Sequence, residues 1–483
     1  MSDVVLVYPK SSFLEAAMNH FYIPLALLNS VIFVEKEFSV KIIDQRVDKN
    51  WKKHLLDELK SNPLCVAVSS LSGEQINYAL EISKIVKENS NALVVWGGIH
   101  ASILPEQTLK NKYIDIIIRG EGEISFYKLV KALSKNKSLK DVPGIWYRKN
   151  GSLRNNKPAK QIDLNKLPNP PYHLVNVKDY ILNFDNKKMF IMETSRGCPN
   201  RCTFCFVQNT CGQKKWRALT PEKTLEKIKF IKDNFEVDGI EFQDLTSFVS
   251  MKRMKEIGQK LIKEKVNIFW NTCARINDII RMDSEYLNIM QKSGATRLAL
   301  GVETGSSRIL KMIKKDITMN QVLTASKKLS KTNLQPVYSF MAGFPSETAK
   351  ELKMTTDLIM YLLKENPKAK STILHCYRPL PGTELFDLCV KKGLKVPKSL
   401  EEWGAYEMEK IDYPWLSKKR QSEISNLNFT SLFLDKKYNE IDDKWVQLFS
   451  KVYKPLAKYR FKNHNFNFMF EPYLKKAYVH LKK

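Results

Sequence analysis

Short, β-branched apolar runs alternate with amphipathic stretches over the first 140 residues. This alternation restricts the possible folds of the chain more than any other feature of the sequence. Five runs have the length and continuity of parallel strands covered on both faces: VVLVYP (4–9), VKIID (40–44), LCVAVSS (64–70), ALVVWGG (92–98) and IDIIIRGEGE (114–123). Helix-like segments such as residues 74–88 separate them. We therefore predict that residues 1–140 form a doubly wound, Rossmann-like α/β domain. Its ligand site should lie at the carboxyl ends of the strands.

A second alternation begins near residue 187, after a segment of different composition. Residues 141–186 contain a predicted hairpin, with Asn150 and Gly151 at its turn, and a proline-rich linker at 168–172. Six further apolar runs predict the strands of a partial (β/α)6 barrel over residues 187–398. These runs lie at 188–197, 239–245, 267–274, 297–304, 334–345 and 370–379. Residues 399–483 lose the strand pattern and predict a helical C-terminal region.

Three of the eight cysteines lie within eight residues, directly after the first predicted barrel strand. RGCPNRCTFCF places Cys198, Cys202 and Cys205 in a C-x3-C-x2-C arrangement. Thiolates are the ligands of iron–sulfur clusters, and three of them can hold three irons of a cubane while the fourth iron stays open. Structural zinc takes four ligands, commonly as two pairs, and no second pair lies nearby. A zinc site and three buried structural cysteines are the alternatives.

This loop resembles that of the radical S-adenosylmethionine superfamily. In that family the cysteine loop follows the first barrel strand and carries a [4Fe–4S] cluster, whose open iron binds the amino and carboxylate groups of S-adenosylmethionine. The resemblance implies further contacts to S-adenosylmethionine from residues of this loop and at the strand ends: Phe204 and Gly343 near adenine, Asp244 facing the site, Arg275 on the methionine carboxylate and Glu303 on the ribose hydroxyls. Each of these residues could instead serve ordinary loop structure.

The first domain resembles the cobalamin-binding domain of class B members of this family, with the same domain order. VSSLSGEQ (68–75), WGGIHAS (96–102) and RGEGE (119–123) carry the likeness. It implies cobalamin contacts from Ser69, Ser70, Ser72, Gly97, Gly98, His100 and Glu121. The Asp-x-His-x-x-Gly motif of better-known cobalamin proteins, whose His binds cobalt, is absent, so we expect His100 near the nucleotide rather than on cobalt. A doubly wound domain without a cofactor is the alternative.

The combined resemblance implies an enzyme that generates a 5′-deoxyadenosyl radical and transfers a methyl group from methylcobalamin to an unactivated carbon. Family members that catalyse oxidative cyclisation or rearrangement provide the first alternative. tRNA methylthiolation would need a second cluster on three cysteines in the first domain, and residues 1–190 contain only Cys65. A non-catalytic iron–sulfur or cobalamin sensor that binds nucleic acid is a further alternative, but no nucleic-acid-binding signature supports it.

The formal net charge of +28 is spread along the chain without a dense block, which indicates a solvated surface and leaves room for an anionic partner. We expect a small-molecule, lipid or peptide substrate, an electron donor such as flavodoxin or ferredoxin, and no nucleic acid. Contact with a membrane surface is compatible with the basic residues that recur among aromatic ones near residues 451–462. Without a signal peptide or a long apolar run, we expect a cytoplasmic protein.

The C-terminal region is rich in aromatic side chains, including Trp403, Trp415, Tyr453 and Phe461. Ordering so much apolar surface requires that it be buried. We therefore expect this region to pack on the barrel and to help close the substrate cavity.

Overall fold

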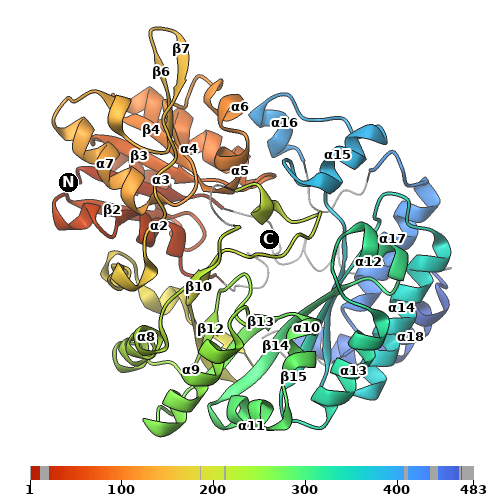
Figure 1. Ribbon diagram of the computed structural model, residues 1–483. Helices are drawn as coiled ribbons and strands as arrows, with labels where there is room; N and C mark the ends of the chain where they lie inside the picture. The colour runs from red at the N-terminus through yellow and green to blue at the C-terminus, as the bar shows by residue number, and fades with distance from the viewer. Residues whose placement is uncertain are drawn as a thin grey trace.

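The computed structural model describes residues 2–10, 21–184, 186–210, 214–406, 412–435, 444–466 and 469. Two large sheets, one from each alternation of the sequence, organise these residues (Figure 1). We call them the N-terminal sheet and the barrel sheet. A small antiparallel pair, β10 (Ser195–Arg196) with β11 (Arg217–Ala218), lies in the connections after the first barrel strand.

The N-terminal sheet has five parallel strands followed by an antiparallel hairpin, counted over the described residues. In spatial order its strands are β2 (Val40–Asp44), β1 (Val4–Tyr8), β3 (Cys65–Ser69), β4 (Leu93–Gly97), β5 (Ile116–Ile118), β6 (Ile145–Lys149) and β7 (Ser152–Asn155). The predicted hairpin turns at Asn150 and Gly151, which both have positive φ, as a two-residue turn of type I′ requires. The hairpin, which the sequence predicts in the connection between the domains, extends the N-terminal sheet by pairing with β5.

Helices accompany the N-terminal sheet, as expected for continuous apolar parallel strands that must be covered. They are α2 (Leu25–Val31), α3 (Trp51–Leu59), α4 (Gln75–Asn89), α5 (Gly98–Ile103), α6 (Pro105–Leu109) and α7 (Gly122–Ser134). The central strand β1 is buried from Val4 to Val7. α2 and α7 lie side by side. The parallel order β2-β1-β3-β4-β5 reverses direction at β1, as in a doubly wound sheet, so this prediction for the first domain is confirmed.

The barrel sheet contains six parallel strands and one antiparallel edge strand among the described residues. Its order is β16 (Lys370–Cys376), β15 (Gln335–Ala342), β14 (Ala295–Glu303), β13 (Phe269–Ala274), β12 (Gly239–Phe242), β9 (Lys187–Met192) and β8 (Leu182–Phe184). Helices connect the parallel strands along the outer side (Figure 1), which confirms the partial barrel. These helices are α8 (Pro221–Asn234), α9 (Met251–Lys263), α10 (Ile276–Arg281), α11 (Ser284–Lys292), α12 (Ser307–Met312), α13 (Met319–Ser330) and α14 (Ala349–Glu365).

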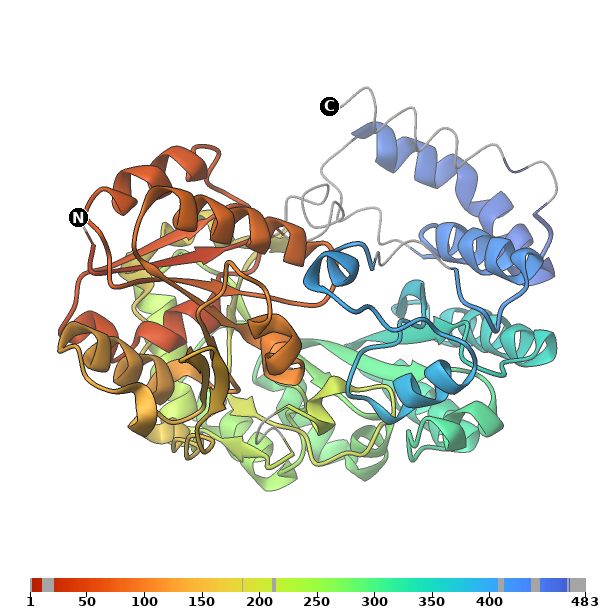
Figure 2. The same ribbon diagram turned by 90° about the horizontal axis from the view of Figure 1, so that it is seen from above.

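The C-terminal region is helical where it is described, as the sequence predicted. α15 (Glu384–Lys391) still belongs to the barrel region. The helices of the C-terminal region are α16 (Leu400–Gly404), α17 (Lys418–Ser431) and α18 (Lys444–Asn463). α17 packs along β16 at the edge of the barrel, α16 packs on α4 of the first domain, and α18 lies at the periphery (Figure 2). Three of the aromatic residues of this region lie outside the described residues: Phe468, Phe470 and Tyr473. Among the described helices none has the length and apolar character needed to cross a membrane.

Candidate active site

Asp244 fixes the entry to the cysteine loop. It follows β12, and one oxygen of its buried carboxylate accepts hydrogen bonds from the backbone N–H groups of Thr194 and Ser195, at 2.7 and 2.8 Å. The hydroxyls of Thr194 and Ser247 donate to the other oxygen, at 2.6 and 3.0 Å. These bonds tie the segment after β9 to the neighbouring strand. Asp244, which we expected among the S-adenosylmethionine contacts, therefore has both oxygens engaged by protein groups.

The three cysteines of the motif lie on one short loop at the carboxyl end of the first barrel strand. Cys202 is buried, and Cys198 and Cys205 are half-buried. The pKa of Cys205 is raised to about 11, first by burial and then by the charges of the neighbouring Cys202 and Cys198 thiolates. The loop thus presents three neighbouring cysteines, and bound iron would stabilise their thiolate form.

The cysteine set fits a cluster better than a single metal ion. Over the described ranges, no three His, Cys, Asp or Glu side chains converge on a point that would hold one ion. A cubane binds each thiolate to a different iron, so its three sulfurs are spread around it. Tetrahedral zinc instead needs four ligands on one centre. Three thiols on one loop are therefore a donor set that suits a [4Fe–4S] cluster.

Two cations lie beside these sulfurs. Arg275, directly after β13, points Nη1 at Cys202 Sγ over 3.6 Å and donates through Nη2 to the carbonyl of Lys315. Lys315 Nζ forms a buried ion pair with Glu303 Oε1 at 2.6 Å. The same Nζ lies 6.0 Å from the ring centre of Phe204. The structure thus gathers Phe204, Arg275 and Glu303, predicted from separate motifs, beside the cysteine loop.

Lys315 is a site residue that no sequence motif indicated. It lies between α12 and α13, in a lysine-rich segment like many others in the chain. Gly301 leaves room for it, because a Cβ at this position would overlap the Glu303 carboxylate and lie 2.6 Å from Lys315 Nζ. Glu303 has a positive φ of 75°, an uncommon conformation for a residue with a side chain. Gly301 in the GVETG motif was therefore the one local indication that another side chain lies close to this strand.

Gly343, at the end of β15, lies against the C-terminal region. Its N–H donates to Glu347 at 2.6 Å, and its carbonyl accepts from Trp415 Nε1 at 3.1 Å. It has a φ of +85°, and an added Cβ would meet Ile424 and Leu416 at 3.4 and 3.5 Å. Burial raises the pKa of Glu347 to about 7. The fifth-strand glycine turn is therefore held in place by residues that follow the barrel.

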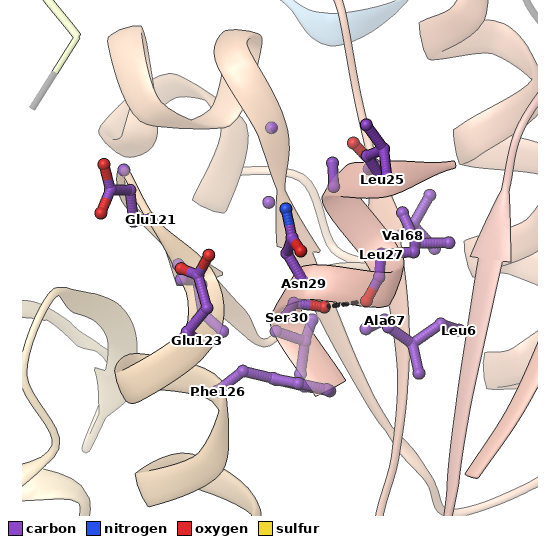
Figure 3. Close-up of a pocket in the computed structure, with 18 of the residues that line it drawn as sticks. Leu6, Leu25, Leu27, Asn29, Ser30, Ala67, Val68, Glu121, Glu123 and Phe126 are labelled. Carbon is purple, nitrogen blue, oxygen red and sulfur yellow. Dashed lines mark hydrogen bonds between the residues drawn. The ribbon is translucent and has the colours of Figure 1, made fainter. Parts of the chain in front are cut away.

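A cavity of about 290 Å³ lies on the N-terminal sheet between α2 and α7 (Figure 3). Strand residues such as Leu6 and Val68 form its apolar side, and Glu123, in the first turn of α7, lies on the opposite side. Four of the residues expected to contact cobalamin line the cavity: Ser69, Gly97, Gly98 and Glu121. The carboxyl ends of β3, β4 and β5 therefore open into one space, as a doubly wound sheet predicts.

Arg196 connects this cavity to the cysteine loop. It belongs to β10, shortly before the first cysteine, and it lines the cavity. Its guanidinium pairs with Glu123 and Glu193, both at 2.7 Å, and with Glu121 at 3.5 Å. Arg217 of β11 also pairs with Glu121. We call these five side chains the charged wall. Because buried charges are stable only when paired, the wall holds the first domain against the cysteine loop.

Three other expected cobalamin contacts lie outside the lining of the cavity. Ser70 donates through Oγ to the Gly97 carbonyl at 3.2 Å. Ser72 Oγ is 2.8 Å from Nδ1 of His100, which is fully buried and packs edge-on against Trp403 with ring centres 5.6 Å apart. Burial lowers the pKa of His100 to about 4. His100 therefore contacts the C-terminal region and Ser72 holds its ring, an arrangement that no sequence motif predicted.

Comparison with known proteins agrees with this geometry. Residues 192–359 match the radical SAM superfamily, and residues 18–130 match the B12 binding domain. An uncharacterized methyltransferase of Pyrococcus horikoshii is 31% identical over 398 residues, which cover 82% of this chain and 84% of that protein. Cytidylyl-2-hydroxyethylphosphonate methyltransferase of Streptomyces wedmorensis is 24% identical, covering 73% of this chain and 72% of its own.

Among solved structures, the radical S-adenosylmethionine methyltransferase TsrM from Kitasatospora setae, with cobalamin and a [4Fe–4S] cluster bound, shares the fold. Its TM-score is 0.72 at 15% identity, with 96% of this chain and 98% of that chain covered. The two matched regions coincide with the domains that carry the cavity and the cysteine loop. The chain belongs to the class B, cobalamin-binding family of radical S-adenosylmethionine enzymes.

Proposed function

We propose that this enzyme is a cobalamin-dependent methyltransferase that methylates a small molecule at an unactivated carbon. The charged wall carries the proposal, because it places Arg196 of the cysteine loop in the lining of the first domain's cavity. A cofactor bound at the cysteine loop and a cofactor bound in the cavity would be neighbours across the charged wall, so both could act on one substrate. The methyltransferase names of two relatives support methyl transfer over other outcomes.

We assign the [4Fe–4S] cluster to Cys198, Cys202 and Cys205. Asn200 Nδ2 lies 3.2 Å from Cys198 Sγ, and Arg275 Nη1 lies 3.6 Å from Cys202 Sγ. Hydrogen bonds and positive charge at the sulfurs stabilise a reduced cluster and so raise its potential. These two side chains are expected to help the cluster accept an electron.

We assign S-adenosylmethionine to the same edge of the barrel. Phe204 and Gly343 would flank its adenine, and the guanidinium of Arg275 would pair with its carboxylate. Glu303 would exchange its bond with Lys315 for the ribose hydroxyls, which leaves the ammonium of Lys315 to neutralise charge beside the cluster. Asp244 would act through the loop that it holds rather than through a direct contact.

We assign cobalamin to the N-terminal cavity and the strand ends around it. A cavity of about 290 Å³ would hold a nucleotide-sized group of the cofactor. Gly97 and Gly98 allow close backbone approach, Ser69 supplies a hydroxyl and Glu121 an acceptor. Ser70, Ser72 and His100 would stabilise the cavity-lining segments without contacting cobalamin. Cluster, S-adenosylmethionine and cobalamin together supply a 5′-deoxyadenosyl radical and a methyl group on cobalt.

The substrate would lie between the charged wall and the C-terminal region. A lipid or peptide that presents one carbon to this space is compatible with it, as is a free small molecule. We also propose a small acidic electron carrier of the flavodoxin or ferredoxin type as the reductant, since the chain carries a net charge of +28.

The test is anaerobic reconstitution with iron, sulfide, cobalamin, a reductant and S-adenosylmethionine bearing a trideuterated methyl group. We expect 5′-deoxyadenosine, S-adenosylhomocysteine and labelled methylcobalamin, and a labelled product when a metabolite extract is added, all read by mass spectrometry. Absence of label from cobalamin and from every product would refute methyl transfer.

Oxidative cyclisation is the second candidate. Anaerobic magnesium-protoporphyrin IX monomethyl ester cyclase of Rubrivivax gelatinosus is 29% identical over 313 residues, although the match spans only 54% of that protein. In the same experiment a cyclase would form 5′-deoxyadenosine and an unlabelled product that has lost hydrogen.

A further inference from the structure

α18 carries an apolar stripe on its solvent side. Val452 is 74% exposed, Tyr459 55%, Leu448 54% and Leu456 39%. Spacings of four, four and three residues place these side chains on one face of a helix. Apolar side chains that are exposed singly are common, but a contiguous row along a helix indicates a contact surface.

The opposite face of α18 fixes the orientation of the helix. Tyr453, Ala457 and Phe461 are buried there, and the ring of Tyr453 lies 4.9 Å from that of Phe433, which follows α17. His464, just beyond the helix, is 2.8 Å from Thr356 Oγ1 of α14 and 2.7 Å from Glu423 Oε1 of α17. Because the helix is anchored on two neighbours, it cannot rotate to bury the apolar stripe.

A row of lysines borders the apolar stripe. Lys451, Lys458 and Lys462 are exposed, and at 100° per residue they fall together along one flank of the stripe. Residues 444–463 contain no Asp or Glu. Within the described ranges, none of the three lysines forms an ion pair. The exposed half of α18 is thus apolar along its middle and purely basic along its edge.

We propose that this face of α18 docks on an anionic membrane surface, with the apolar stripe in the headgroup region and the lysines on acidic lipids. Amphipathic helices with lysine on the polar side bind membranes in this way, and each lysine near such a surface adds about 1 kcal/mol, or about fivefold. A second copy of the chain fits less well, since it would set two all-basic helices side by side. The surface is independent of the cofactor sites and of the reaction proposed above.

Flotation of the full-length protein with vesicles tests the proposal. We expect binding to vesicles of phosphatidylcholine with phosphatidylglycerol, and little binding to phosphatidylcholine alone. V452E should lower the partition coefficient at least about tenfold, because it puts a charge at the centre of the stripe. The triple variant K451A/K458A/K462A should lower it on the order of a hundredfold and flatten its salt dependence.

Matched variants separate the surface from general effects. L323E changes an exposed leucine on α13, and K49A/K52A/K53A removes the same charge from the exposed end of α3; both should bind vesicles like the unaltered protein. Circular dichroism and thermal unfolding should match for all variants. Equal binding to neutral vesicles, full binding by V452E, or a stripe-dependent dimer without vesicle binding would each overturn the proposal.

Discussion

The cysteine loop and the N-terminal cavity both lie at the carboxyl ends of parallel strands, but they are built by opposite means. The loop is held by dense polar contacts, with Asp244 on its entry and Arg275 on a cysteine sulfur. The cavity is lined mainly by apolar and small residues, among them Gly97 and Gly98, which have no side chain to fill it. Rigid charges suit a small inorganic cluster, whereas space and backbone suit a large organic cofactor.

The charged wall is the place where the two constructions meet. Arg196 comes from the cysteine loop, and Glu121 and Glu123 come from the first domain. A change on either side of the wall should therefore affect one cofactor, while a change within it should affect both. The following variants test this division, from the largest expected effect to the smallest.

Replacing a cysteine of the loop should abolish the chemistry without touching the cavity. Cys205→Ala should lower bound iron from about four per chain and bring 5′-deoxyadenosine formation to background, because the cluster loses one of its three thiolate ligands. Cobalamin affinity, followed by its absorption spectrum, should stay unchanged. Cys273→Ala on β13 is the matched control and should keep its iron. Normal iron content and turnover in Cys205→Ala would remove the cluster assignment.

The two glycines at the cavity rim should fail in different ways. Gly98 has a φ of +88°, and an added Cβ would lie 2.6 Å from the Ser70 carbonyl oxygen. Gly98→Ala should therefore cost about 1–3 kcal/mol of folding free energy, seen as a lower Tm. At Gly97 an added Cβ would meet only the Ile118 oxygen at 4.0 Å. Gly97→Val should leave Tm unchanged and weaken cobalamin binding at least about tenfold, because it fills the cavity.

A single substitution in the charged wall should affect both cobalamin binding and the chemistry at the cysteine loop. Glu123→Gln removes one carboxylate from buried Arg196 and should weaken cobalamin binding and slow 5′-deoxyadenosine formation together, each about tenfold, or about 1.4 kcal/mol. Glu106→Gln on α6 removes a carboxylate that pairs with exposed Lys110 and serves as the control. An effect confined to one cofactor would show that the wall does not couple the two regions.

His100 should make stability depend on pH without affecting cobalt. Burial lowers its pKa to about 4 in the folded protein, whereas an exposed histidine has a pKa of about 6.5. Between about pH 6.5 and 4, His100 is therefore protonated in the unfolded chain but not in the folded one. The free energy of unfolding should fall as pH falls through this window, by up to about 3 kcal/mol. His100→Gln should flatten the dependence of Tm on pH in this window and leave the cobalamin spectrum unchanged.

Features that depend on neighbouring residues were predictable from the sequence. The strands of both sheets follow from short apolar runs, and the cysteine motif lies within eight residues of a strand that was recognised. The hairpin at Asn150 and Gly151 follows from the conformations that these two residues tolerate. Such features are set by local backbone preference and by the periodicity of apolar side chains, so the fold class and the candidate cluster ligands could be read directly.

Only the tertiary structure decided which distant residues meet. Lys315 reaches Glu303 from a loop without a motif, Arg196 reaches Glu123 from another domain, and Trp403 covers His100 from the C-terminal region. These pairings depend on how whole elements pack and on which buried charges must be satisfied, and a linear pattern carries neither. The sequence by itself therefore determined the elements and the chemistry of the cysteine loop. Packing decided the charged wall and the partners of each buried polar group, because a buried charge is stable only where the completed fold supplies its counterpart.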